Sequence, residues 1–226
     1  RLGSWESIYM NGPLDFSGKV VVIIGGDDGL GGQVAQGFLT AGAAVTIAAN
    51  REPSAPPAAQ GRTADFQACD PGNYEQVETT IEQVRNTEGR LDTVVIADGS
   101  AAAQGSANTP EDIIRQHLVA PLNVSQLANR IMQAQDSGGN IIYLVGSSTQ
   151  PDGALAAAYS AAGAGVRNLV TSLAVEWAPR VRVNAVDAAS LPTAPADVCN
   201  ACLFLASGLS DYVSGSCVVP GNAGSR

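Results

Sequence analysis

The chain has 226 residues, a length that fits one domain with a sizeable core. Hydrophobic residues make up 45% of it and charged residues 15%, which excludes an intrinsically disordered chain. The net charge of −9, with Lys19 as the single lysine, leaves no basic cluster to contact the phosphates of a nucleic acid or an anionic membrane.

No apolar run approaches the roughly 18–20 residues that a helix needs to cross a bilayer. The segment from Arg1 to Asp15 lacks the basic start and the apolar block of a secretory signal. We therefore expect a soluble, cytoplasmic protein with no nucleic-acid partner and no membrane association.

The chain starts with a segment of no clear hydrophobic period, residues 1–17, which we interpret as an N-terminal arm. Residues 18–226 are expected to form a single domain. The run Lys19–Ile24 is continuously apolar and β-branched, as is typical of a strand buried on both faces of a parallel sheet. A glycine-rich turn leads into a predicted helix over Leu30–Ala41, and a strand follows over Ala44–Ala48.

The alternation of strand and helix continues after a Pro- and Ala-rich segment, Glu52–Arg62, which is predicted to be a surface loop. Further strands are predicted over Thr63–Ala68, Leu91–Ala97, Asn140–Val145, Val181–Val186 and Cys217–Val219. Further helices are predicted over Asn73–Glu88, Pro110–Ala134, Leu155–Trp177 and Ala196–Ala206. This alternation implies right-handed crossovers. The predicted fold class is therefore α/β, a Rossmann-type doubly wound parallel sheet in three layers with about seven strands.

Four cysteines are present, and two of them form a CxxC motif, a spacing that zinc sites and redox sites also use. The segment that holds the motif, Asp197–Ala206, is apolar at helical spacing, and the chain offers no second pair of ligands. We therefore predict buried helical cysteines that behave as small hydrophobic residues. No metal is assigned to Cys69, Cys199, Cys202 or Cys217.

The turn after the first strand has the pattern GxxxGxG, with glycines at Gly25, Gly29 and Gly31. In a strand–turn–helix context these glycines would allow a tight turn, the approach of backbone N–H groups to a pyrophosphate, and close packing of helix on strand. The alternative is that they only shape the turn in a protein that no longer binds a nucleotide. Asp27 and Asp28 favour this alternative, because they place two carboxylates where phosphates would lie.

The end of the second strand carries no acidic residue for a ribose 2′-hydroxyl, because the sequence there is Ala48-Ala49-Asn50-Arg51. Selection of NAD is therefore unsupported. Arg51 could contact the 2′-phosphate of NADP, or it is an exposed arginine at the start of a loop.

Several blocks in the second half of the chain resemble the short-chain dehydrogenase/reductase family. With Lys19–Gly31, the resemblance covers about residues 18–221 and implies a Rossmann-type fold and NAD or NADP as the cofactor. The blocks are Tyr159–Gly163, Gly165–Leu169, Ser172–Ala178, Arg182–Val186, Asp197–Ser207 and Tyr212–Gly215.

The resemblance implies four catalytic groups. A tyrosine exchanges the hydroxyl proton, and a lysine four residues later binds the nicotinamide ribose and lowers the tyrosine pKa. A serine about a dozen residues before the tyrosine polarises the carbonyl, and an asparagine in the preceding helix supports a proton path.

Of these groups, the chain retains the tyrosine as Tyr159, and Gly163 stands at the lysine position. The asparagine position is His117, the single histidine, and the serine position is Gly146 or Ser147. A tyrosine without a nearby cation has a pKa of about 10 and is a poor base at neutral pH. Tyr159 and Ser147 are therefore interpreted as vestigial catalytic residues.

Other positions of the family pattern are partly kept. Asp70 stands where the family has an aspartate that contacts adenine, although an aspartate before Pro71-Gly72 is also ordinary turn chemistry. Gly99 is the one residue kept from the family's NNAG motif. The Pro-Gly turn after the sixth strand is absent, and the segment 187–195 is too short for the family's substrate-binding lid.

These departures favour a non-catalytic subunit of this family over an enzyme. The expected partner is a catalytically intact relative, in a hetero-oligomeric NAD(P)-dependent alcohol or hydroxyacyl dehydrogenase. The resemblance implies a dimer or tetramer formed through the helix Ala154–Trp177 and the C-terminal strand, Tyr212–Val219. The Ala, Gly and Ser residues of that helix would allow close approach of a second helix.

Two other functions stay open. The chain could be an atypical NAD(P)-dependent oxidoreductase that uses Tyr159, or a nucleotide-responsive regulatory protein. A Ser147–His117 pair could also support acyl transfer, although a packed helix histidine and a loop serine explain the same two residues.

Overall fold

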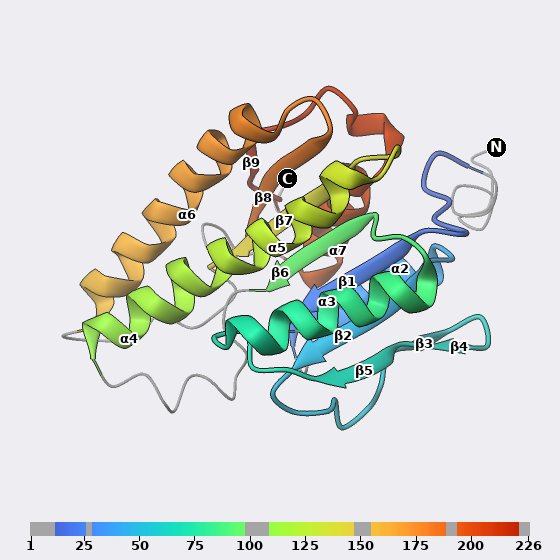
Figure 1. Cartoon of the computed structure of the whole chain (residues 1–226), viewed down its shortest axis with the longest axis horizontal. Helices are drawn as coiled ribbons and strands as arrows, with labels where there is room; N and C mark the ends of the chain where they lie inside the picture. Colours follow the sequence, from blue (N-terminus) through green and yellow to red (C-terminus); the bar gives the residue numbers. More distant parts are fainter. Residues whose placement is uncertain (1–11, 26–28, 98–108, 147–154, 189–193, 222–226) are drawn as a thin grey trace.

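The computed structural model describes residues 12–25, 29–97, 109–146, 155–188 and 194–221. They form a three-layer α/β structure around a seven-stranded parallel sheet with the strand order β5-β2-β1-β6-β7-β8-β9 (Figure 1). The predicted fold class and the predicted number of strands are therefore confirmed.

The strands of the main sheet are short, and most residues of its central strands are buried. Val20–Ile24 (β1) has five buried residues and lies between β2 and β6, which explains its continuous apolar sequence. The other strands are Ala44–Ala49 (β2), Asp65–Ala68 (β5), Thr93–Ala97 (β6), Gly139–Val145 (β7), Val181–Asp187 (β8) and Cys217–Val218 (β9).

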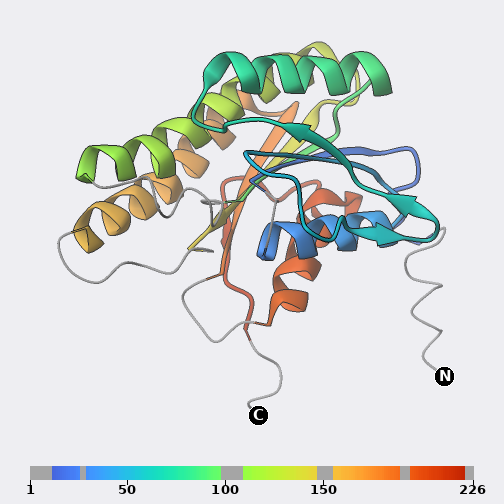
Figure 2. The ribbon, with the colours of Figure 1, turned by 90° about the horizontal axis from the view of Figure 1, so that it is seen from below.

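The helices cover both faces of the sheet (Figure 2). Tyr74–Glu88 (α3), Ala120–Ala134 (α5) and Ala156–Trp177 (α6) pack on one face, and Leu30–Thr40 (α2) and Pro195–Ala206 (α7) pack on the other. Each face has its own hydrophobic core. A short 3₁₀ turn, Gly208–Ser210 (η3), follows α7.

Three predicted elements differ from the structure, and each difference has a local cause. The predicted loop Glu52–Arg62 contains a hairpin, because Ala58–Ala59 (β3) pairs antiparallel with Arg62–Thr63 (β4). Its two turn residues, Gln60 and Gly61, both have positive φ, as a tight two-residue hairpin turn requires. The predicted strand Thr63–Ala68 is consequently divided between β4 and β5.

The predicted helix Pro110–Ala134 is interrupted by a π-helical turn. Pro110–Ile114 (α4) is followed by Arg115–Val119 (η2), and α5 begins only at Ala120. Pro121 has no N–H to donate to the carbonyl four residues earlier, which belongs to His117. The i→i+5 bond from Ala120 N to Arg115 O belongs to the wider turn.

The described part of the predicted arm contacts the domain. Phe16 is 4% exposed, and its ring packs edge-on against Phe38 of α2 at a centroid distance of 5.2 Å. The backbone N–H of Phe16 donates to the carbonyl of Ala41 at 2.7 Å. The boundary between residues 17 and 18 stays a prediction. No helix among the described residues is both long enough and apolar enough to cross a bilayer.

Candidate active site

The predicted site residues gather at the carboxyl edge of the sheet. In a parallel sheet the carboxyl ends of all strands lie on one side, and ligands of such folds bind there. Gly25 follows β1, Gly146 follows β7, and Asp187 ends β8. Helix α2 starts just after Gly29 on the same side. Two predicted site residues, Ser147 and Gly99, lie outside the described residues.

The glycine turn is built for close approach of backbone. Gly25 has φ of 85°, and its N–H donates to the Ala48 carbonyl at 2.8 Å. A Cβ at this position would lie 2.9 Å from the Ala97 carbonyl oxygen, so a side chain here would force β1 and β6 apart. The glycine is therefore required by the sheet itself, whether or not a nucleotide binds.

The start of α2 offers room for a phosphate. Gly29 caps the helix with φ of 71°, and a Cβ placed on it would meet no atom within 4 Å. Gly31 is buried, and the first turn of α2 carries no acidic residue. The backbone donors at this helix start are thus of the kind that bind a pyrophosphate. Nothing among the described residues opposes a phosphate at this position, and Asp27 and Asp28, the carboxylates predicted there, lie outside the described residues.

The ribose-selecting position carries no acidic residue in the structure either. Asn50 and Arg51 follow β2 and are both exposed. Asp70, the predicted adenine contact, makes a turn instead: its Oδ1 accepts a hydrogen bond from Gly72 N at 2.9 Å, and its carbonyl accepts one from Asn73 N at 2.9 Å. These bonds support the turn interpretation of Asp70, and contact with adenine stays a prediction.

Two predicted residues from distant segments, His117 and Tyr159, come together. The His117 ring of η2 and the Tyr159 ring of α6 have centroids 4.7 Å apart and are tilted by 48°. His117 is 5% exposed and Tyr159 is partly buried. A π-helical turn often marks a functional position. Here it places the single histidine against the tyrosine.

One helical turn after Tyr159, the lysine position is occupied by Gly163, and a different cation lies beside it. A Cβ on Gly163 would lie 3.7 Å from Nη1 of Arg167 and 3.9 Å from Cγ1 of Val145. Nη2 of Arg167 forms an ion pair with Oδ2 of Asp187, whose side chain is 3% exposed. The hydrogen bond that the Arg167 guanidinium donates to Asp187 raises the pKa of Arg167, and partial desolvation opposes this effect.

Sequence reasoning missed both Arg167 and Asp187. The signal was available in part, because Arg167 lies four residues after Gly163, and residues with this spacing share a helix face. Asp187 directly follows a strand that ends at the expected site, but a carboxylate at a strand end is also common in turns.

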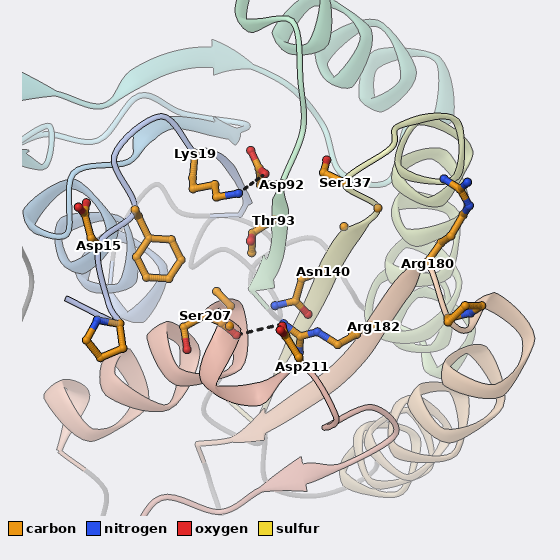
Figure 3. Close-up of a pocket in the computed structure, with 17 residues that line it drawn as sticks. Asp15, Lys19, Asp92, Thr93, Ser137, Asn140, Arg180, Arg182, Ser207 and Asp211 are labelled. Carbon is orange, nitrogen blue, oxygen red and sulfur yellow. Dashed lines mark hydrogen bonds and ion pairs between the residues drawn. The ribbon is translucent and has the colours of Figure 1, made fainter. Parts of the chain in front are cut away.

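The described cavity shown in Figure 3 lies at the opposite edge of the sheet. It has a volume of about 420 Å³ and is lined by the amino ends of β1, β6, β7 and β8. Two of its cationic side chains bind groups of the protein itself: Lys19 forms an ion pair with Asp92 at 3.3 Å, and Arg182 donates a hydrogen bond to Ser210 Oγ at 3.1 Å. Burial lowers the pKa of Arg182. This cavity contains none of the predicted site residues.

The described cysteines and acidic residues do not form a metal site. Within the described ranges, no three His, Cys, Asp or Glu side chains lie close enough together to hold an ion. Burial raises the pKa of Cys199 to about 11 and also raises the pKa of Cys202 well above its ordinary value. Both cysteines lie in α7, as the apolar pattern predicted.

Comparison with known proteins agrees with this architecture. Residues 19–199 match the family model described as short chain dehydrogenase. The chain is 32% identical over 237 residues to a 3alpha-hydroxysteroid dehydrogenase of Mediterraneibacter gnavus, covering 87% of this chain and 93% of that protein. It is 29% identical over 252 residues to a sorbose reductase of Schizosaccharomyces pombe, covering 93% and 97%.

Solved structures give the same result. A short-chain type dehydrogenase/reductase from Mycobacterium marinum superposes with a TM-score of 0.77 at 26% identity, over 92% of this chain and 95% of that one.

Proposed function

This chain belongs to the short-chain dehydrogenase family, and from that premise we propose that it is a non-catalytic subunit within the family. Its partner would be a catalytically intact relative, in a hetero-oligomeric NAD(P)-dependent alcohol or hydroxyacyl dehydrogenase. The relatives compared above are named as dehydrogenases or reductases, so the chemistry of the complex would be oxidation and reduction.

One observation carries the proposal: Gly163 stands one helical turn after Tyr159 on α6, where the family has its lysine. The cation beside Gly163 is Arg167, and it is committed to an ion pair with Asp187. The group that would bind the nicotinamide ribose and acidify the tyrosine is therefore replaced. A tyrosine without that help is a poor base at neutral pH.

Exposed apolar side chains support an oligomeric role. Val175 of α6 is 79% exposed, and Tyr212 and Leu209, which lie between α7 and β9, are fully and 58% exposed. Strand β9 ends the sheet and pairs only with β8 among the described strands, so it leaves an open edge. Large apolar residues and an open edge strand are typical of surfaces that a partner covers. Both lie in the elements that the resemblance assigns to oligomer contacts.

The proposal is tested by native mass spectrometry of the endogenous complex, purified through a tag on this chain. We expect an intact relative in fixed ratio and dehydrogenase turnover that depends on that relative. The matched control is this chain purified alone, which should show no turnover with NADH or NADPH. A homo-oligomer that turns over by itself would contradict the proposal.

A second candidate function is an atypical oxidoreductase that uses Tyr159. It is favoured by the contact between the His117 and Tyr159 rings, which places two proton-carrying groups together at the carboxyl edge. This candidate predicts turnover by the chain alone that the substitution Tyr159→Phe abolishes. Unchanged turnover in that variant would exclude a proton-transfer role for the tyrosine.

A further inference from the structure

The side chain of Arg167 covers the helical turn that begins at Gly163. Side chains on a helix lean toward its N-terminus, so a long side chain lies over the turn before it. With no side chain at Gly163, the guanidinium settles there, with Nη1 3.7 Å from where a Cβ would be. The guanidinium therefore lies in van der Waals contact with the first side-chain carbon that a residue at position 163 would have, and it is the cation beside the lysine position.

Asp187 holds this arginine in place. It is the last residue of β8, pairs in register with Val145 of β7, and is 2% exposed. A buried carboxylate is costly unless it has charged or hydrogen-bonding partners, so losing the ion pair with Arg167 would be destabilising for Asp187. The thiol of Cys217 in β9 also faces the guanidinium.

We infer that the Arg167–Asp187 ion pair closes the half of the cofactor site that would receive the nicotinamide-side ribose. The inference rests on the proposed non-catalytic role and extends it, since the phosphate half fits at α2 while the nicotinamide half does not. The phosphate half of the site and its nicotinamide half therefore differ in whether this chain's residues fit the cofactor. As a result, the chain does not bind a whole nicotinamide dinucleotide.

Restoring the lysine alone does not reopen the site. A lysine at position 163 would have its Cβ in contact with the guanidinium. It would also place a second positive charge four residues from Arg167 on the same helix face, which is unfavourable. Removing Arg167 alone would take an ion-pair partner from a buried carboxylate. Both members of the pair must therefore change together with position 163.

The experiment measures binding of NADH and NADPH, by cofactor fluorescence, to four forms of the full chain. These are the unchanged chain, Gly163→Lys, the double variant Arg167→Leu/Asp187→Asn, and the triple variant that combines all three substitutions. ADP serves as the control ligand because it lacks the nicotinamide-side ribose, and its binding is measured by isothermal titration calorimetry because it has no nicotinamide fluorescence. Circular dichroism and thermal melting check that each variant is folded.

We expect no measurable NADH or NADPH binding to the unchanged chain or to Gly163→Lys. The triple variant should bind at least one of the two, with a dissociation constant at least about tenfold below the lower limit that the titration sets for Gly163→Lys; a factor of ten is about 1.4 kcal/mol. The affinity for ADP should be the same in the unchanged chain and in the triple variant.

Three results would overturn the inference: cofactor binding by the unchanged chain, equal binding by Gly163→Lys and the triple variant, or a folded triple variant that does not bind. The first of these leaves the non-catalytic role intact if no turnover accompanies binding. Turnover by the unchanged chain alone would overturn the proposed function as well.

Discussion

The sulfur of Cys199 in α7 fills the space left by the missing side chain of Gly37 in α2. A Cβ placed on Gly37 would overlap Cys199 Sγ. The two helices therefore lie closer together here than a larger residue at position 37 would allow. The CxxC motif is thus a packing feature: Cys202 is fully buried, and Cys199 lies in the contact between helices.

Substitution of Gly37 by alanine should destabilise the protein by about 1–3 kcal/mol, because the new methyl group overpacks the α2–α7 contact. The variant Cys199→Ala removes the overlapping sulfur. In a double-mutant cycle measured by urea unfolding, Gly37→Ala should cost at least about 1 kcal/mol less in the Cys199→Ala background. Additive effects of the two substitutions would show that the sulfur does not limit the approach of the helices.

The same cysteine predicts a loss of stability at high pH. Burial raises the pKa of Cys199 from its ordinary value of 9.0 to about 11 in the folded state. The unfolded chain therefore loses its proton first, and the contribution of Cys199 is complete below pH 9 and falls as the pH rises toward 11. Near the upper end of this pH range the free energy of unfolding is lower by about 2–3 kcal/mol.

This pH effect is measured as the free energy of unfolding at about pH 8 and about pH 10.5, in the unchanged chain and in Cys199→Ala. Cys199 is also one cause of the raised pKa of Cys202, so the difference between the two proteins reports Cys199 together with its effect on Cys202. Equal pH dependence in the two proteins would mean that the thiol ionises as readily in the folded state as in the unfolded chain.

The sheet was predictable because each of its strands has a local signature. The run Val20–Ile24 is apolar on both sides, and such a segment is stable only between other strands. The π-helical turn at Arg115–Val119 could not be predicted, because the apolar spacing around it is that of an ordinary helix. Pro121 is the one residue in the sequence that marks the interruption. A proline near a helix interior usually ends or kinks the helix.

The candidate site was predictable in its motif residues and not in its ion pair. Tyr159, Gly163 and His117 are found by their place in family blocks. The contact between His117 and Tyr159 joins segments 42 residues apart, and the Arg167–Asp187 pair joins a helix to a strand end. Such contacts depend on how α6 lies against the sheet, and no short-range pattern specifies that geometry.

We expect the side chain of Asn184 to hold the C-terminal segment, residues 213–218, against β8. Its side chain is fully buried in β8; Nδ2 donates to the Val213 carbonyl at 2.8 Å, and Oδ1 accepts from Ser216 N at 3.1 Å. The substitution Asn184→Ala leaves both backbone groups without this partner, so we expect a loss of about 2–3 kcal/mol. Hydrogen exchange at residues 213–218 should rise in the same variant.

The control for Asn184 is Asn86→Ala on the exposed surface of α3, which should change stability by less than about 0.5 kcal/mol. If Asn184→Ala speeds exchange throughout the sheet and not mainly at residues 213–218, its role is general core packing. If it leaves stability unchanged, the two hydrogen bonds are not what holds β9 against β8.

Substitutions at Gly138 and Gly89 distinguish two costs of adding a side chain: the cost of a left-handed backbone angle and the cost of steric overlap. Both have left-handed backbone angles, with φ of 63° and 77°. A Cβ on Gly89 would meet no atom within 4 Å, whereas a Cβ on Gly138 would overlap the backbone carbonyl oxygen of Arg180, just before β8. We expect Gly89→Ala to cost about 1–2 kcal/mol from conformation alone. Gly138→Ala should cost about 2–4 kcal/mol, because β8 must also shift. Thermal and urea unfolding of the two variants compare these costs directly, and equal losses would show that the carbonyl of Arg180 yields without strain.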